Sequence, residues 1–212
     1  MCQYSRVTPT EFIIKGDLLM LTIRKQALAL SLTICSISYV YADDVEERKK
    51  AAMATTQEFA KKLGGQMQAA MKDGGPTNAV RVCSDVAPQL TGEMSRKTGW
   101  KVTRVGTKVR NSMLGTPDAW EQTVLAQFEE RKAKGESLDK MAFSEVVSEP
   151  GGKYFRFMKA IGIQQGCLQC HGSKDQVLPE VEMVLEERYP HDLARDYKVG
   201  DLRGAISIKQ PM

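Results

Sequence analysis

The sequence lacks long hydrophobic runs and any run of basic residues interleaved with aromatic ones. Its longest nearly apolar stretch, Ala27–Val40, has 14 residues, whereas a membrane-spanning helix needs about 20. The sequence has no cluster of basic and aromatic residues of the kind that binds nucleic acid, so no nucleic-acid partner is expected. No repeat, low-complexity segment or interdomain linker occurs, so the chain beyond this stretch amounts to a single domain.

The short apolar stretch is typical of a secretory signal peptide. Residues 1–19 have no periodic pattern and are interpreted as an over-extended start, while residues 20–42 form the leader. Basic Arg24-Lys25 precedes the apolar core, and Val40-Tyr41-Ala42 supplies the small-residue cleavage pattern. The alternative is an uncleaved anchor. Cleavage after Ala42 predicts a periplasmic product of residues 43–212 with no stable membrane insertion.

Cysteine and histidine are scarce, which limits the disulfide, metal and cofactor sites that the chain can form. Export removes Cys2 and Cys35 and leaves three cysteines, Cys83, Cys167 and Cys170. An odd number of cysteines in an exported chain excludes a simple disulfide framework. The pair spaced three apart and the single cysteine therefore need separate roles.

Hydrophobic periodicity predicts an α+β domain, with helices first. Apolar residues at steps of three and four indicate helices over residues 45–71 and 79–94, with glycines as stops. Pro88 cannot donate a hydrogen bond to Ser84, so a kink or restart is expected there. Thr116 is expected to cap a third helix that ends at Gly135.

The second half of the domain is expected to form an antiparallel sheet. Strands are predicted at residues 100–109, 142–147 and 154–161, and a half-buried strand at residues 205–209. A further helix is expected over residues 179–188. Runs of helices followed by runs of strands favour the α+β class.

The motif that carries chemistry is Cys167-Leu168-Gln169-Cys170-His171. It has the C-x-x-C-H pattern of haem c attachment. Positions i, i+3 and i+4 share one face of a helical turn, so two thiols can bond to the porphyrin vinyl groups while His171 serves as proximal iron ligand. One covalent haem is therefore expected. The alternatives are a thiol–disulfide pair and a zinc site, which would need Cys83 and His191 to complete four ligands.

The sixth iron ligand is open among four residues. Met158 and Met183 are possible donors with no distinguishing pattern, and His191 lies in a polar turn where exposure to solvent is expected. Cys83 lies on the apolar face of a predicted helix, where it is either a ligand or a small buried hydrophobe.

These segments resemble a known family of single-haem c-type domains with a PAS-like fold. Members are stand-alone periplasmic proteins, photosystem-associated cytochromes and sensory input domains. The resemblance rests on these segments: Val82-Cys83-Ser84 with Ala87-Pro88, Gly99–Arg104, Lys108–Asn111, Pro117–Glu121, Cys167–Gly172, Tyr189-Pro190 and Gly200–Ser207. It implies a PAS-like domain with N-terminal helices packed on an antiparallel sheet. It also implies that Cys83 binds iron opposite His171.

A periplasmic mono-haem cytochrome for one-electron transfer or redox response is the leading functional expectation. A thiolate opposite His171 would stabilise ferric iron, so a low potential and a redox partner protein are expected. The alternative is a haem-based sensor for a small gas, acting through a partner. An enzyme such as a peroxidase would need a positioned acid–base residue, and with His191 as the one other histidine no catalytic residue is assigned.

Overall fold

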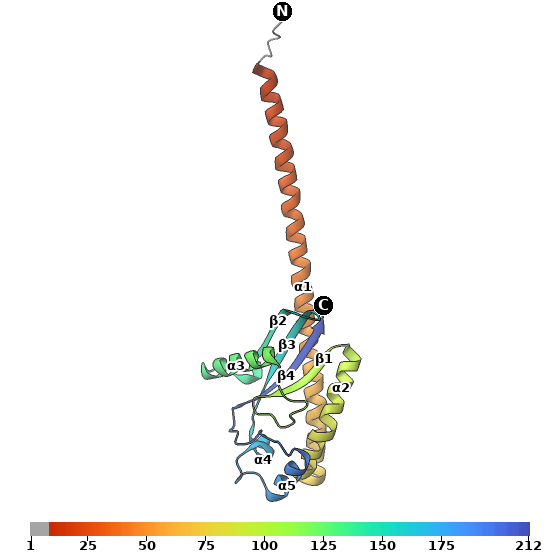
Figure 1. The fold of residues 1–212 in the computed structure, drawn as a ribbon, viewed down its shortest axis with the longest axis vertical. Helices are drawn as coiled ribbons and strands as arrows, with labels where there is room; N and C mark the ends of the chain where they lie inside the picture. The colour runs from red at the N-terminus through yellow and green to blue at the C-terminus, as the bar shows by residue number, and fades with distance from the viewer. Residues whose placement is uncertain (1–8) are drawn as a thin grey trace, which may run out of the picture. The chain divides into compact units, whose positions relative to one another are not determined.

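The computed structural model describes residues 43–212 in full and only the backbone of residues 9–42. The leader predicted for residues 1–42 lies outside the fully described part. The chain divides into two units, Met1–Glu47 and Arg48–Met212, and the second holds the sheet and its covering helices (Figure 1). Within the fully described part, no helix combines the length and apolar character needed to cross a membrane.

Four antiparallel strands form one sheet in the order β1-β4-β3-β2. They are β1 Lys101–Gly106, β2 Ala142–Glu149, β3 Gly152–Gly162 and β4 Leu202–Pro211. Strand β4 comes last in sequence but pairs with β1 on one side and β3 on the other. Its residues are buried on both faces because helices cover both sides of the sheet, and the prediction of a half-buried strand at residues 205–209 was wrong on this point.

The helices end and restart where glycine and proline predict it. They are α1 Pro9–Arg81, α2 Ala87–Thr98, α3 Ala119–Ala133, α4 Leu168–His171 and α5 Pro179–Arg188. Gly75, Gly99 and Gly135 have positive φ angles of 69°, 73° and 88°, which glycine adopts without steric cost. The first of these breaks α1 near its end.

The turn before Pro88 is wound as a π-helix, η1 Val82–Val86, between α1 and α2. Pro88 lies in the first turn of α2, where its missing N–H costs no helical hydrogen bond. The restart predicted near Ser84 is confirmed.

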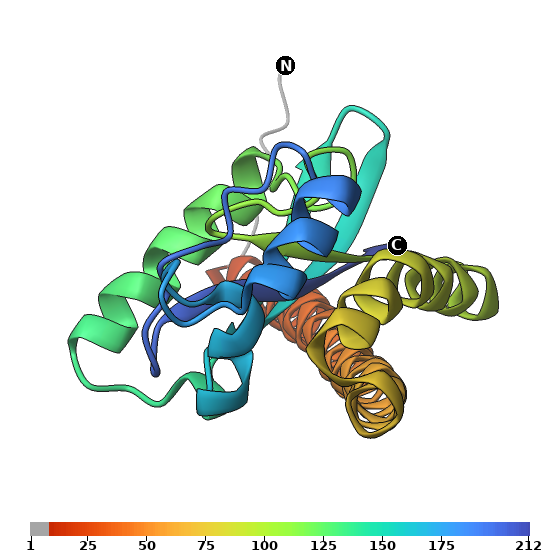
Figure 2. The same cartoon turned by 90° about the horizontal axis from the view of Figure 1, so that it is seen from below.

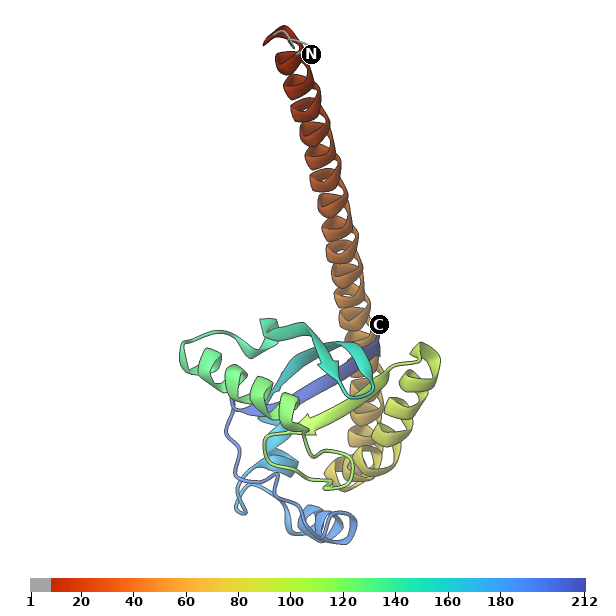
Figure 3. The same ribbon diagram turned by 45° about the horizontal axis from the view of Figure 1, so that its top comes forward.

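Helices cover both faces of the sheet (Figure 2). On one face, Val124 and Phe128 of α3 pack with Met158 and Ala205, and α3 runs across the strands in Figure 3. Since side chains alternate along a strand, the buried Phe157 points to the opposite face. That face lies toward α2 and the part of α1 beyond Glu47. The expected α+β class, with helices packed on an antiparallel sheet, is confirmed.

The start of α3 differs from the prediction. Asp118 caps the helix, and Thr116 does not: the Asp118 carboxylate accepts from the Glu121 N–H at 2.9 Å, while Glu121 accepts from the Asp118 N–H at 2.8 Å. This reciprocal capping box satisfies two helix-end donors at once. It displaces the Thr116 hydroxyl from the role that sequence assigned to it.

A buried arginine fixes this capped end to the sheet. Arg156 of β3 is 3% exposed and pairs with Asp118 at 2.7 Å, Glu149 at 3.2 Å and Glu121 at 3.4 Å. Its guanidinium carbon also lies 4.2 Å from the Trp120 ring centroid.

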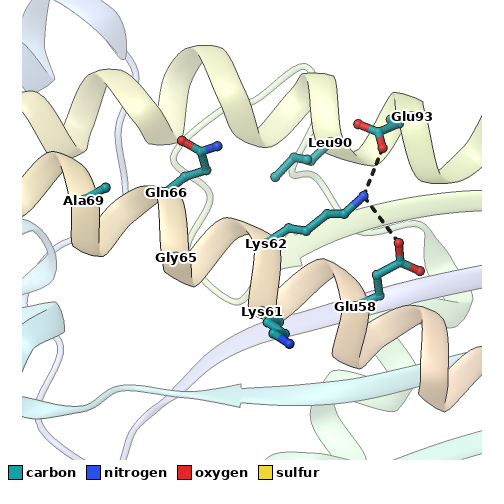
Figure 4. A pocket seen from close by; sticks show the side chains of 8 residues that line it. All are labelled: Glu58, Lys61, Lys62, Gly65, Gln66, Ala69, Leu90 and Glu93. Atoms are coloured by element: carbon teal, nitrogen blue, oxygen red, sulfur yellow. Dashed lines mark hydrogen bonds and ion pairs between the residues drawn. The ribbon is translucent and has the colours of Figure 1, made fainter.

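The ion pairs of Lys62 are exposed to solvent, in contrast to those of Arg156. Figure 4 shows the groove between α1 and α2, where the partly exposed Lys62 extends between Glu58 and Glu93.

Arg156→Ala should lower the free energy of unfolding by about 3–5 kcal/mol, because it leaves the buried Glu121 carboxylate without its partner. Urea denaturation of the purified protein measures this loss. Lys62→Ala is the control, since its ion pairs are exposed to solvent, and its loss should be much smaller. Equal losses in the two variants would contradict the role given to Arg156.

Candidate functional site

Three strand ends meet at one edge of the sheet and place the cysteine motif there. Strands β1 and β3 end beside the start of β4, with Gly106 opposite Gly204 and Gly162 opposite Leu202. The Ile163 N–H donates to the Asp201 carbonyl at 2.8 Å and continues the pairing for one residue. The segments that leave these ends therefore emerge side by side.

The motif occupies one compact turn after β3. A 3₁₀ turn, η3 Gln165–Cys167, leads into α4, and the Gly172 N–H closes α4 on the Leu168 carbonyl at 2.9 Å. A Cβ on Gly172 would lie 2.6 Å from that carbonyl oxygen, so this closure requires glycine. Cys167, Cys170 and His171 are each half-buried, and the structure brings all three together as the spacing predicts.

The His171 ring is held in one orientation. Its Nδ1 lies 2.9 Å from the Ala194 carbonyl oxygen, and the Tyr197 ring stands edge-on to it with centroids 6.1 Å apart. Because a carbonyl oxygen can only accept, Nδ1 carries the proton and Nε2 keeps its lone pair. Histidine ligands of metals are generally oriented in this way.

The surroundings of His171 keep it neutral. Burial, followed by the positive charges of Arg110 and Arg203, lowers its pKa to about 2, against the raising effect of the Ala194 hydrogen bond. A neutral imidazole with a free Nε2 is the form that binds metals.

The two motif thiols face different apolar clusters. Cys170 packs against Val181, Leu185 and Tyr189, and Cys167 packs against Ile163 and its neighbours. Burial raises the pKa of the Cys170 thiol to about 11, partly offset by the Arg110 charge. Both thiols thus border an apolar environment, and Cys170 stays protonated at neutral pH.

Cys83 lies close to the motif although 84 residues separate it from Cys167. It sits in η1, and a charge on its sulfur raises the pKa of both Cys170 and Tyr189. Val80, one turn earlier, packs in the same cluster as Tyr189. The third cysteine of the described part is therefore close enough to Cys170 to act on it electrostatically, although these side chains are not grouped closely enough to hold a metal ion by themselves.

The other candidate ligands lie elsewhere. Met158 is fully buried under α3, on the core cluster of the sheet. Met183 is 64% exposed on α5, and His191 is exposed in its turn. Among residues 43–212, no three His, Cys, Asp or Glu side chains are grouped to hold a metal ion, so a zinc site has no ligand set in this part.

Sequence reasoning assigned no role to the charged and aromatic residues that surround His171, although Arg110, Tyr189 and Arg203 lie in segments that carry the family resemblance. The Arg110 guanidinium donates to the Cys170 carbonyl and pairs with Asp192 at 3.0 Å. Arg203 donates to the Lys108 carbonyl at 3.0 Å and lies 5.6 Å from the Tyr197 ring. These contacts join segments far apart in sequence, and no local spacing marks them.

The neutral His171 predicts a pH dependence of stability in the polypeptide without cofactor. As pH falls below about 6.5, His171 becomes protonated in the unfolded chain, whereas in the folded chain it stays neutral until about pH 2. Stability should fall with pH in this window by at most about 1.4 kcal/mol per unit. Denaturant unfolding between pH 6.5 and 4.5 should show a shallower slope for His171→Gln. His191→Gln, at the exposed histidine, should keep the wild-type slope; an unchanged slope in both would refute the burial argument.

Comparison with known proteins places this arrangement in a family. No curated protein sequence matches the chain. The crystal structure of the cyanobacterial heme-protein Tll0287 matches with a TM-score of 0.61 and 23% identity, over 78% of this chain and 96% of that one. At this identity the likeness shows a shared fold. The profile of the Tll0287-like family matches residues 22–211, and the chain therefore belongs to that family.

Proposed function

We propose that this chain binds one haem covalently through Cys167 and Cys170, with His171 as proximal iron ligand. The observation that carries the proposal is the His171–Ala194 hydrogen bond of 2.9 Å, which leaves Nε2 free beside two thiols on one turn. The family relationship supports it, since a similar structure is that of a heme-protein. Thioether formation needs no oxidant: each sulfur bonds to a vinyl carbon, and the thiol proton goes to the neighbouring carbon.

The residues around His171 fit a bound haem. Besides two thiols and a histidine, the site has two guanidiniums, Arg110 and Arg203, each with a buried Nε that lacks a hydrogen-bond partner. Unsatisfied buried donors are costly, and positively charged ones bind carboxylates strongly. The two propionates of a haem are anions of this kind.

One-electron transfer is the chemistry that a bound haem would supply here. The chain's own residues would hold and tune it. His171 presents a fixed lone pair, the apolar clusters around Cys167 and Cys170 exclude water, and Cys83 approaches from η1. A thiolate from Cys83 would favour ferric iron and lower the potential, which suits a redox partner of low potential.

A sensor for a small gas or redox signal, acting through a partner protein, is the second candidate, and the π-helix favours it. Single π-helical turns occur often at functional sites, and Cys83 lies within one at partial exposure. Reduction removes one positive charge from iron and weakens a thiolate bond, so a ligand could exchange there. Spectra of the reduced protein with and without carbon monoxide separate the two functions: a carrier keeps its spectrum, whereas a sensor changes it.

The covalent attachment predicts a haem stain that survives denaturation. The full-length protein, exported in cells that mature c-type cytochromes, should retain peroxidase staining in a denaturing gel. Cys167→Ala and Cys170→Ala should each reduce the stain, since each removes one thioether, and the double variant should lose it. Cys83→Ala is the matched cysteine control and should keep the full stain. Haem lost from the wild type on acid–acetone extraction would overturn the proposal.

Cys83→Ala should abolish the thiolate-type electron paramagnetic resonance signal of the ferric protein and raise its midpoint potential, because a strong anionic donor is lost. His191→Ala should change neither measurement, since its side chain is exposed. A Cys83→Ala protein with the wild-type ferric signal would show that Cys83 is only a packing residue.

A further inference from the structure

The main chain of Ala194 is held at both its N–H and its carbonyl beside His171. Its carbonyl oxygen receives the His171 Nδ1 at 2.9 Å and the Arg110 Nη2 at 3.3 Å. Its N–H donates to the Asp192 carboxylate at 2.8 Å. The acceptor that orients the histidine is thus shared with a cation, and an anion holds the preceding peptide through the Ala194 N–H.

Arg110 and Asp192 are themselves a buried ion pair. Their side chains are 9% and 4% exposed, and they lie 3.0 Å apart. Arg110 also donates to the Cys170 carbonyl, so it ties the cysteine turn to the 192–195 segment. Asp192 accepts a further hydrogen bond from the Arg195 Nε at 2.8 Å, which completes the network.

We propose that Arg110 and Asp192 are positioning residues for His171, and that they set the strength of its hydrogen bond to Ala194 and hence the redox potential of the bound iron. This inference rests on the proposed haem function. A carbonyl oxygen shared with a guanidinium is a weaker acceptor for Nδ1–H, which reduces the electron donation of the imidazole to the metal.

The two residues should act with opposite signs. Without Arg110, the Ala194 oxygen accepts from His171 alone, and a positive charge leaves the site; both changes stabilise ferric iron and lower the potential. Without the Asp192 charge, Arg110 is free to bind Ala194 more strongly, and a negative charge leaves; both changes raise the potential. A merely structural pair would not give shifts of opposite sign.

Arg203 supplies the comparison for charge alone. It carries a guanidinium whose charge acts on His171, but it donates to the Lys108 carbonyl and not to Ala194. Arg203→Gln should lower the potential, because it removes a positive charge together with a propionate partner, and it should leave the histidine's hydrogen bond as it was.

The test measures the midpoint potential and the ferric electron paramagnetic resonance spectrum of the haem-loaded protein. Arg110→Gln should shift the potential down and Asp192→Asn should shift it up, and both should alter the g-values. Arg110→Lys keeps the charge, but its side chain ends one bond short of the Nη2 position from which all three contacts are made, so its g-values should also change. Arg203→Gln should shift only the potential.

Two outcomes would overturn the inference. Arg110→Lys with wild-type g-values would show that Arg110 acts through charge only, and shifts of one sign in Arg110→Gln and Asp192→Asn would show that the pair only stabilises the fold. Haem staining of each variant is measured in parallel. A wild-type protein without covalent haem refutes the proposed function itself, whereas stained variants with unchanged spectra refute only the positioning role.

Discussion

The hydrogen bond from His171 to the Ala194 carbonyl is the constraint on which the site depends. A half-buried imidazole surrounded by positive charges is stable only as the neutral ring, and its Nδ1–H must then find an acceptor. The acceptor comes from a segment 23 residues further on, so this segment must fold over the cysteine turn. The meeting of β1, β3 and β4 at one edge makes that possible, because all three loops leave the sheet at the same place.

Local sequence rules account for the helices and for the cysteine turn. Gly99 and Gly135 end helices because their φ angles are positive, and Pro179 begins α5 as predicted. Pro88 interrupts the helix and a new helix starts there, and the turn before it is a π-helix that carries Cys83. These features follow from backbone geometry over a few residues, and the sequence predicts such local geometry.

Features that depend on contacts between distant segments could not be predicted. The burial of β4 follows from its central place in a sheet that helices cover on both faces, and no alternation within residues 202–211 reveals that arrangement. Thr116 and Asp118 are both residue types that cap helices well. Asp118 caps α3 because Arg156 on the sheet also pairs with its carboxylate. Arg110 and Asp192 are likewise joined only by folding.

The cost of the Arg110–Asp192 pair argues that it does more than stabilise the fold. Burying two charges removes their hydration, and replacing a buried ion pair by apolar side chains of similar volume is often neutral or stabilising. An apolar pair here would leave the Ala194 N–H and the Cys170 carbonyl without their present partners. The charged pair satisfies these groups and adds a second donor to the carbonyl that accepts from His171, which apolar packing does not achieve.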